Sequence, residues 1–128
     1  MTPNALCRAY LEALDAGDLD AVLALFAEDA TVVSPLYGVR DARGFYTDLF
    51  ADTARSETEL LNIFENSGTG GAVALHFRYR WTLADGTRKP FEVVDVIEMA
   101  ADGQRFGRLT ILYDTAPLRA DWGKVHHR

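Results

Sequence analysis

The chain has 128 residues, of which 48% are hydrophobic and 25% charged, the balance of a single globular domain over residues 1–128. Its formal net charge of −6 argues against a nucleic acid or an anionic membrane surface as a partner. No apolar run is long enough to span a bilayer, and the single cysteine, Cys7, fits a reducing compartment, so we expect a cytoplasmic protein.

The first helix is predicted from its two ends and its spacing. Thr2 offers a hydroxyl at the N-cap, and Pro3 suits the first helical position. Apolar residues, among them Cys7 and Tyr10, then recur on one face until Gly17 ends the helix. We therefore expect an amphipathic helix that buries both of these side chains.

A second helix is predicted to begin after Asp18, which is a good N-cap residue. Val22, Leu25 and Phe26 have the spacing of one buried helix face. The polar residues 27–29 then interrupt the apolar pattern, so we expect this helix to end before them.

A short strand and a third helix follow. Residues 31–34 are typical of a strand that Pro35 stops, and residues 36–38 are expected to form a loop. A helix is predicted over residues 41–53, with Phe45 on its apolar face.

From there the apolar period changes from helical to alternating, which predicts strands joined by tight turns at Asp85-Gly86 and Asp102-Gly103. The longest predicted strand carries aromatic residues on one face, and His76 with two arginines on the other. Because alternation in a half-buried strand is strict, we expect His76 to face solvent or a second copy of the chain. The predicted strands cover residues 59–64, 72–83, 91–99 and 106–113, and the tail 114–128, with His126 and His127, is expected to be irregular and exposed.

Three helices followed by a meander of about four antiparallel strands give an α+β architecture. Only the helices are available to cover the apolar face of the sheet. A curved antiparallel sheet packed on three N-terminal helices makes a cone, and the interior of a cone is a natural pocket for a small molecule.

One acidic residue breaks the pattern of the strand at 91–99. Asp95 falls on the same face as Phe91, Val93 and Ile97, whereas Glu92 falls on the opposite face. A lone carboxylate among apolar side chains is costly, so it must be paired, hydrogen-bonded, hydrated or protonated. We expect its pKa to be raised by burial, which would leave a neutral acid that can donate a hydrogen bond.

Two interpretations of Asp95 stay open at this stage. In the first, Asp95 and Tyr10 are two hydrogen-bond donors that converge on one ligand oxygen and stabilise an oxyanion. In the second, Asp95 is a structural acid that is hydrogen-bonded to Tyr10 or to another polar group of the core.

Two stretches of the chain resemble a known family. Residues 10–20 (YLEALDAGDLD) and 25–31 (LFAEDAT) are similar to the opening of the nuclear transport factor 2-like superfamily, which includes the ketosteroid isomerases and the SnoaL-like polyketide cyclases. The resemblance implies an α+β cone, commonly dimerised through its sheet. It says little about chemistry, because this fold hosts isomerases, dehydratases, cyclases, hydrolases and plain binding domains.

Within the superfamily, the chain resembles the bacterial ketosteroid isomerases at two of three important positions. The resemblance implies that Tyr10 is an oxyanion-hole tyrosine and that Asp95, eight residues before Gly103, is a protonated aspartic acid. The family's general base is an aspartate before a proline, and that position holds Ser34 before Pro35 here. Serine cannot act as a base without an activating neighbour, so the donor pair matches and the base does not.

The pocket wall is assigned from strand faces and from the loop after the first strand. No cluster of His, Cys or carboxylate side chains has metal-ligand spacing, and no glycine-rich loop leads from a strand into a helix, so neither a metal nor a cofactor is expected. The predicted substrate-binding residues are Ser34, Tyr37, Phe77, Tyr79, Trp81, Leu109 and Tyr113.

Three functions remain open from the sequence. The first is an enzyme of isomerase, dehydratase or cyclase type that acts on an apolar carbonyl compound, with Tyr10 and Asp95 as the oxyanion-stabilising pair. The second is a non-catalytic binding domain for an apolar small molecule, and the third is a dimerisation module. We also expect a homodimer, from the family habit and from the mixed polar face of the longest strand.

Overall fold

The structure is a computed structural model that describes residues 1–68 and 71–117. Its helices are α1 (Pro3–Ala16), α2 (Leu19–Leu23) and α3 (Ala42–Ala51). Its strands are β1 (Phe26–Ser34), β2 (Gly38–Asp41), β3 (Thr53–Glu65), β4 (Val73–Leu83), β5 (Arg88–Met99) and β6 (Phe106–Leu112). Of the predicted tail, only the first residues are described, and His126 and His127 lie outside this part.

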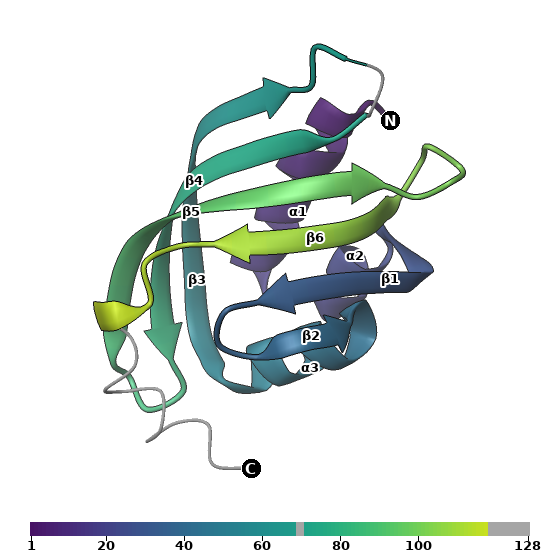
Figure 1. Ribbon diagram of the computed structural model, residues 1–128. Coiled ribbons are helices and arrows are strands. Elements are labelled where there is room, and N and C mark those ends of the chain that lie inside the picture. Colours follow the sequence, from purple (N-terminus) through teal and green to yellow (C-terminus); the bar gives the residue numbers. More distant parts are fainter. Residues whose placement is uncertain (69–70, 118–128) are drawn as a thin grey trace.

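The described strands form one curved sheet in the order β2-β1-β6-β5-β4-β3, and the helices lie together on one side of it (Figure 1). α1 packs on β3, and α3 packs on β1, β2 and β3. The core lies between these helices and the inner face of the sheet. The predicted α+β class and the curved sheet covered by three helices are confirmed.

The helix ends are set locally, as the sequence indicates. Thr2 Oγ1 accepts a hydrogen bond from the Ala5 N–H at 3.1 Å, and Gly17 ends α1 in the left-handed region with φ of 63°. The carboxylates of Asp18 and Asp41 cap α2 and α3 in the same way as Thr2 caps α1. These boundaries confirm the predicted starts of all three helices.

The junction between α2 and β1 differs from the prediction. Phe26 opens β1, so Leu25 and Phe26 do not belong to a helix face, and residues 27–29 lie within the strand. The strand is held by a distant partner, because Phe26 pairs with Phe106 and the Leu25 carbonyl accepts from the Phe106 N–H at 2.8 Å. Local periodicity carries no information about such a partner.

The sheet also differs from a purely antiparallel meander. β3 to β6 pair antiparallel in chain order, as predicted, but β1 pairs with β6 in parallel, so the sheet is mixed. Gly38, predicted to be in a loop, begins β2 with φ of 82° and pairs with Ser34. β2 was not predicted because it has only four residues and none of them is buried, so it shows no alternation of apolar and polar side chains.

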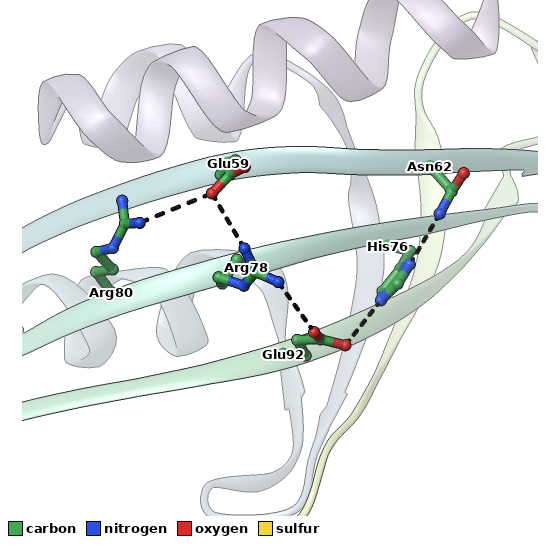
Figure 2. A network of polar contacts seen from close by, with 6 residues as sticks. All are labelled: Glu59, Asn62, His76, Arg78, Arg80 and Glu92. Carbon is green, nitrogen blue, oxygen red and sulfur yellow. Dashed lines mark hydrogen bonds and ion pairs between the residues drawn. The ribbon is translucent and has the colours of Figure 1, made fainter.

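A chain of polar contacts crosses the outer face of the sheet (Figure 2). Glu59 on β3 lies 3.4 Å from Arg78 and 3.7 Å from Arg80 on β4. Glu92 on β5 lies 3.4 Å from Arg78 and 3.2 Å from His76. This part of the outer face is therefore covered by ion pairs, whereas the inner face is mostly apolar.

His76 stays on the outer face of β4. The irregularity in pairing near it falls in β3, between Leu60 and Asn62, and does not turn β4 over. The His76 ring lies 3.2 Å from the Asn62 amide (Figure 2). The prediction that His76 faces away from the core is confirmed.

Candidate functional site

A small cavity lies between the inner face of the sheet and the helices α1 and α3. Its volume is about 50 Å³. A cavity of about 150 Å³ is known to hold benzene, so a ring-sized ligand would require the wall to move outward. The lining is mostly aromatic and aliphatic. It consists of Tyr10, Leu14, Ser34, Tyr37, Phe45, Leu49, Phe77, Tyr79, Trp81, Phe91, Val93, Asp95, Ile111 and Tyr113.

Asp95 is the acidic side chain of this cavity. It projects from the inner face of β5, is 2% exposed, and pairs with Leu75 on β4 and Ile111 on β6. Within residues 1–68 and 71–117, no group makes a hydrogen bond or an ion pair with its carboxyl. Burial raises the pKa of Asp95 well above its ordinary value, because an apolar environment favours the neutral acid over the carboxylate.

Tyr10 projects from α1 into the same cavity, but it does not bond to Asp95. Its hydroxyl lies 2.8 Å from the hydroxyl of Tyr46 on α3, and either group can be the donor. Burial raises the pKa of Tyr10 well above 10.0, with smaller contributions from Tyr46 and Asp95. This geometry removes the Asp95–Tyr10 hydrogen bond that one of the two interpretations of Asp95 allowed.

Tyr46 completes a polar pair that the sequence did not reveal. When Tyr46 donates to Tyr10, the Tyr10 proton is free to bond to a ligand. Phe26 and Phe106 pack edge-on against the Tyr10 ring, with centroids 6.3 and 6.2 Å away, and hold it in place. The available signal was the position of Tyr46 on the buried face of α3, where a hydroxyl needs a partner.

Ser34 ends β1 and faces the cavity. Its Oγ accepts hydrogen bonds from the Leu36 and Tyr37 N–H groups at 3.2 and 3.1 Å. A serine that accepts from the backbone in this way fixes the turn that leads away from a strand. Among the described residues none is placed to activate its hydroxyl, which agrees with the expectation that Ser34 is not a base.

Tyr37, at the other end of this turn, is held in place by a hydrogen bond and by an aromatic contact. Its hydroxyl donates to the buried carboxyl of Asp52 at 2.7 Å, and its ring packs edge-on against Phe45 at 5.2 Å. Tyr37 therefore lines the cavity, as the sequence predicts, with its hydroxyl engaged by Asp52.

The long wall of the cavity comes from β4. The Tyr79 hydroxyl lies 2.8 Å from Ser56 Oγ, and the Trp81 indole N–H donates to Thr53 Oγ1 at 2.8 Å. The Tyr79 and Trp81 rings are stacked, with an interplanar angle of 13°. Because their polar ends are engaged elsewhere, these side chains offer the cavity flat apolar faces, alongside Phe77.

The structure corrects one predicted wall residue. Leu109 is fully buried, pairs with Val32 and Ile97, and does not line the cavity. The lining residue of β6 is Ile111, two positions further along the strand, because the cavity lies beyond the packed end of the core. Alternation predicts which side chains of β6 lie on the inner face. It does not predict the position along the strand at which the packed core ends and the cavity begins. Tyr113 does line the cavity.

Burial raises the pKa of the Cys7 thiol to about 11, so the thiol is not a thiolate nucleophile at pH 7. In residues 1–68 and 71–117 no group of three or more His, Cys, Asp or Glu side chains is placed to hold a metal ion. No helix in that part is both long and apolar enough to cross a membrane.

The family model described as SnoaL-like domain matches residues 7–106 of the chain. The chain belongs to the SnoaL-like domain family. This match includes the opening stretches that suggested the superfamily, together with Tyr10, Ser34 and Asp95. The predicted membership of the nuclear transport factor 2-like superfamily is thus confirmed.

Solved structures agree with this assignment of the SnoaL-like chain. A protein of ketosteroid isomerase-like fold from Catenulispora acidiphila, in complex with trimethylamine, has a TM-score of 0.77 and 16% identity over 96% of this chain and 95% of that one. A nuclear transport factor 2-like protein of unknown function from Burkholderia pseudomallei has a TM-score of 0.75 and 19% identity over 98% and 97%. A delta 5-3-ketosteroid isomerase from Mycobacterium sp. has a TM-score of 0.71 and 20% identity over 90% and 95%. At these identities the likeness shows the fold alone.

Proposed function

We propose that this SnoaL-like protein is an enzyme of isomerase, dehydratase or cyclase type that acts on an apolar carbonyl compound. The observation that carries the proposal is the Asp95 carboxyl, which is buried, lines the cavity and has no hydrogen-bond partner in the described part of the chain. A neutral acid in that position is a hydrogen-bond donor with no acceptor among residues 1–68 and 71–117. A ligand oxygen would satisfy it.

Tyr10 and Asp95 would act on the carbonyl oxygen of the substrate. When a proton leaves the carbon next to a carbonyl, negative charge develops on the oxygen. A hydrogen bond to a charged partner stabilises by about 1.5–3 kcal/mol, against about 0.5–1.5 kcal/mol for a neutral one. Each donor would therefore favour the transition state over the bound ketone by about 1 kcal/mol or more, which is the preference that catalysis needs.

The proton acceptor is the part of the mechanism that this chain does not supply in the usual place. Asp95 is the only acidic side chain among the described residues that line the cavity. Ser34, at the position of the usual base, has both oxygen lone pairs engaged by backbone N–H groups. We infer that a water molecule or a group of the substrate removes the proton, so the rate lacks the factor of about 10²–10⁴ that a built-in base contributes.

Proton exchange at the carbon next to a carbonyl tests this function directly. Candidate ketones are incubated in deuterated water, and loss of the exchanging proton is followed by NMR with wild type, Asp95→Leu and Tyr10→Phe. The proposal predicts exchange faster than in buffer with wild type, and about tenfold slower or more with either variant. Exchange at the buffer rate by a wild-type protein that binds the ketone would contradict it.

A second candidate function is a non-catalytic binding domain for an apolar small molecule. The observation that favours it is the absence of a second carboxylate among the described lining residues. Such a domain would bind the ketone in an Asp95-dependent manner without accelerating exchange, so the same experiment separates the two functions.

A further inference from the structure

The Ser34 hydroxyl has hydrogen-bonding capacity that the Tyr10–Asp95 pair does not use. A serine hydroxyl has two acceptor lone pairs and one donor proton. The Leu36 and Tyr37 N–H groups occupy the acceptor side of Ser34 Oγ at 3.2 and 3.1 Å. Ser34 is 6% exposed and lines the cavity, and none of the residues 1–68 and 71–117 accepts its proton. The proton is therefore available to a ligand in the cavity.

We propose that Ser34 is a third hydrogen-bond donor of the cavity, and that Ser34 and Asp95 together select compounds with two acceptor oxygens on opposite sides of one ring. The inference rests on the proposed function, because it uses the same cavity and the same Asp95 donor. It adds the class of substrate, a cyclic dicarbonyl or a related compound with two acceptor oxygens.

The sheet register fixes the spacing between the two donors. Asp95 on β5 pairs with Ile111 on β6. Val33 on β1 pairs in parallel with Thr110, so the next residue, Ser34, lies level with Ile111. β1, β6 and β5 are neighbours in the sheet, which places the Cα atoms of Ser34 and Asp95 about 10 Å apart, or two strand spacings.

Once the wall has moved outward to admit a ring, this spacing suits a ring with an acceptor at each end. Side chains that project from one sheet face parallel to each other keep about the spacing of their Cα atoms at their donor oxygens. Two O–H···O hydrogen bonds of about 2.7 Å, directed toward each other from those oxygens, would then leave roughly 5 Å between the two ligand oxygens. That separation corresponds to oxygens on opposite carbons of a six-membered ring. A compound with one oxygen would satisfy Asp95 and leave the Ser34 proton buried without a partner, which lowers its affinity.

The test compares cyclohexane-1,4-dione with cyclohexanone, which has the same ring and one carbonyl. Dissociation constants are measured by NMR titration for wild type, Ser34→Ala, Ser34→Asp, Ser34→Thr and Asp95→Leu. We expect wild type to bind the dione about threefold to tenfold more tightly than the monoketone, beyond the statistical factor for two equivalent carbonyls. Ser34→Ala should abolish this preference, because position 34 then has no proton to offer to a second ligand oxygen.

The other variants distinguish the role of Ser34 as a hydrogen-bond donor to the ligand from its role in fixing the turn after β1. Ser34→Asp keeps oxygen acceptors for the Leu36 and Tyr37 N–H groups but has no proton to donate when ionised, so the preference should be lost as well. Ser34→Thr keeps the hydroxyl and should keep the preference. Asp95→Leu should lower the affinity of the protein for both ketones.

Two patterns of failure are distinguishable. If Asp95→Leu weakens both ketones but the dione is not preferred by wild type, or the preference survives in Ser34→Ala and Ser34→Asp, the role of Ser34 is overturned and the proposed function stands. If wild type binds neither ketone, or if Asp95→Leu lowers the affinity for neither ketone, the proposed function and the inference both fail.

Discussion

At the scale of single residues, the ionisation of Asp95 couples folding to pH. An unfolded aspartate ionises near 3.8, whereas burial holds the folded pKa of Asp95 well above that value. Between the two pKa values the folded state keeps a proton that the unfolded state has released. The free energy of unfolding therefore falls as pH rises through this window, by up to about 1.4 kcal/mol per pH unit.

Asp95→Asn should remove this dependence, because the amide does not titrate. In urea unfolding from pH 4 to pH 8, we expect the stability of Asp95→Asn relative to wild type to rise with pH. A wild-type curve parallel to that of Asp95→Asn would show that Asp95 ionises normally. So would a carboxyl carbon chemical shift of Asp95 with an ordinary midpoint.

Ser34 gives a gain-of-function prediction at the same scale. In Ser34→Asp, the Leu36 and Tyr37 N–H groups can bond to the new carboxylate and favour its ionised form. This places a base across the cavity from Asp95. We expect isomerisation of a β,γ-unsaturated ketone to accelerate, by at most about 10²–10⁴, measured as the rise in absorbance of the conjugated enone.

The controls for this gain are Ser34→Asn, which has the same shape without the charge, and Asp95→Leu in the Ser34→Asp background. Neither should show the gain. If the ketone binds and Ser34→Asp leaves its rate unchanged, the isomerase-like arrangement does not apply to this chain, and Tyr10 and Asp95 are better explained as structural residues.

At the scale of elements, the start of α3 contains two conflicting local preferences. Gly44 lies inside α3, where alanine stabilises a helix by about 1 kcal/mol relative to glycine. However, a Cβ at Gly44 would lie 2.5 Å from Asp41 Oδ1, the atom that caps the helix by accepting from the Gly44 N–H at 3.2 Å. The cap is itself worth about 1 kcal/mol. We therefore expect Gly44→Ala to give little or no stabilisation in thermal or urea unfolding.

A double-mutant cycle isolates this conflict. Asp41→Ala alone should destabilise the protein by about 1 kcal/mol. In the Asp41→Ala background the contact with Asp41 Oδ1 is gone, and the remaining close atom, Arg40 Nη2 at 3.2 Å, is the end of a flexible side chain. Gly44→Ala should then stabilise by about the full propensity difference. If Gly44→Ala changes the free energy of unfolding equally in both backgrounds, a Cβ at position 44 does not disturb the Asp41 cap.

At the scale of the whole molecule, we predict a homodimer that forms through the outer face of the sheet. The half-buried His76 and the ion pairs of Glu59, Arg78 and Glu92 lie on that face (Figure 2). Exposed ion pairs contribute about 0–1 kcal/mol to a monomer. A two-fold interface uses the same surface patch on both subunits, so one substitution changes the charge twice. A reversed charge on this face would therefore introduce electrostatic repulsion at two places in the interface.

Arg78→Glu should therefore shift the protein toward monomer in light scattering at micromolar concentration, with an unchanged circular dichroism spectrum. Arg43→Glu, the same change on the exposed surface of α3, is the matched control and should remain dimeric. A monomer mass for the wild type would contradict the prediction.

Local physics made the helix starts, the faces of β4 and β5, and the position of Asp95 predictable from the sequence. Caps act over three or four residues, and alternation assigns a face from one residue to the next. Thr2, Gly17 and Asp41 therefore mark helix ends without knowledge of the fold. Asp95 is identified as a buried acid for the same reason, since its neighbours along the strand define the inner face.

The remaining features depend on partners that are distant in the sequence. The parallel pairing of β1 with β6 removes Phe26 from the predicted helix and sets the level at which Ser34 faces Asp95. The Tyr10–Tyr46 bond joins residues 36 positions apart. Such contacts are decided by the packing of whole elements, because the free energy that fixes them is gained only when both partners are buried together.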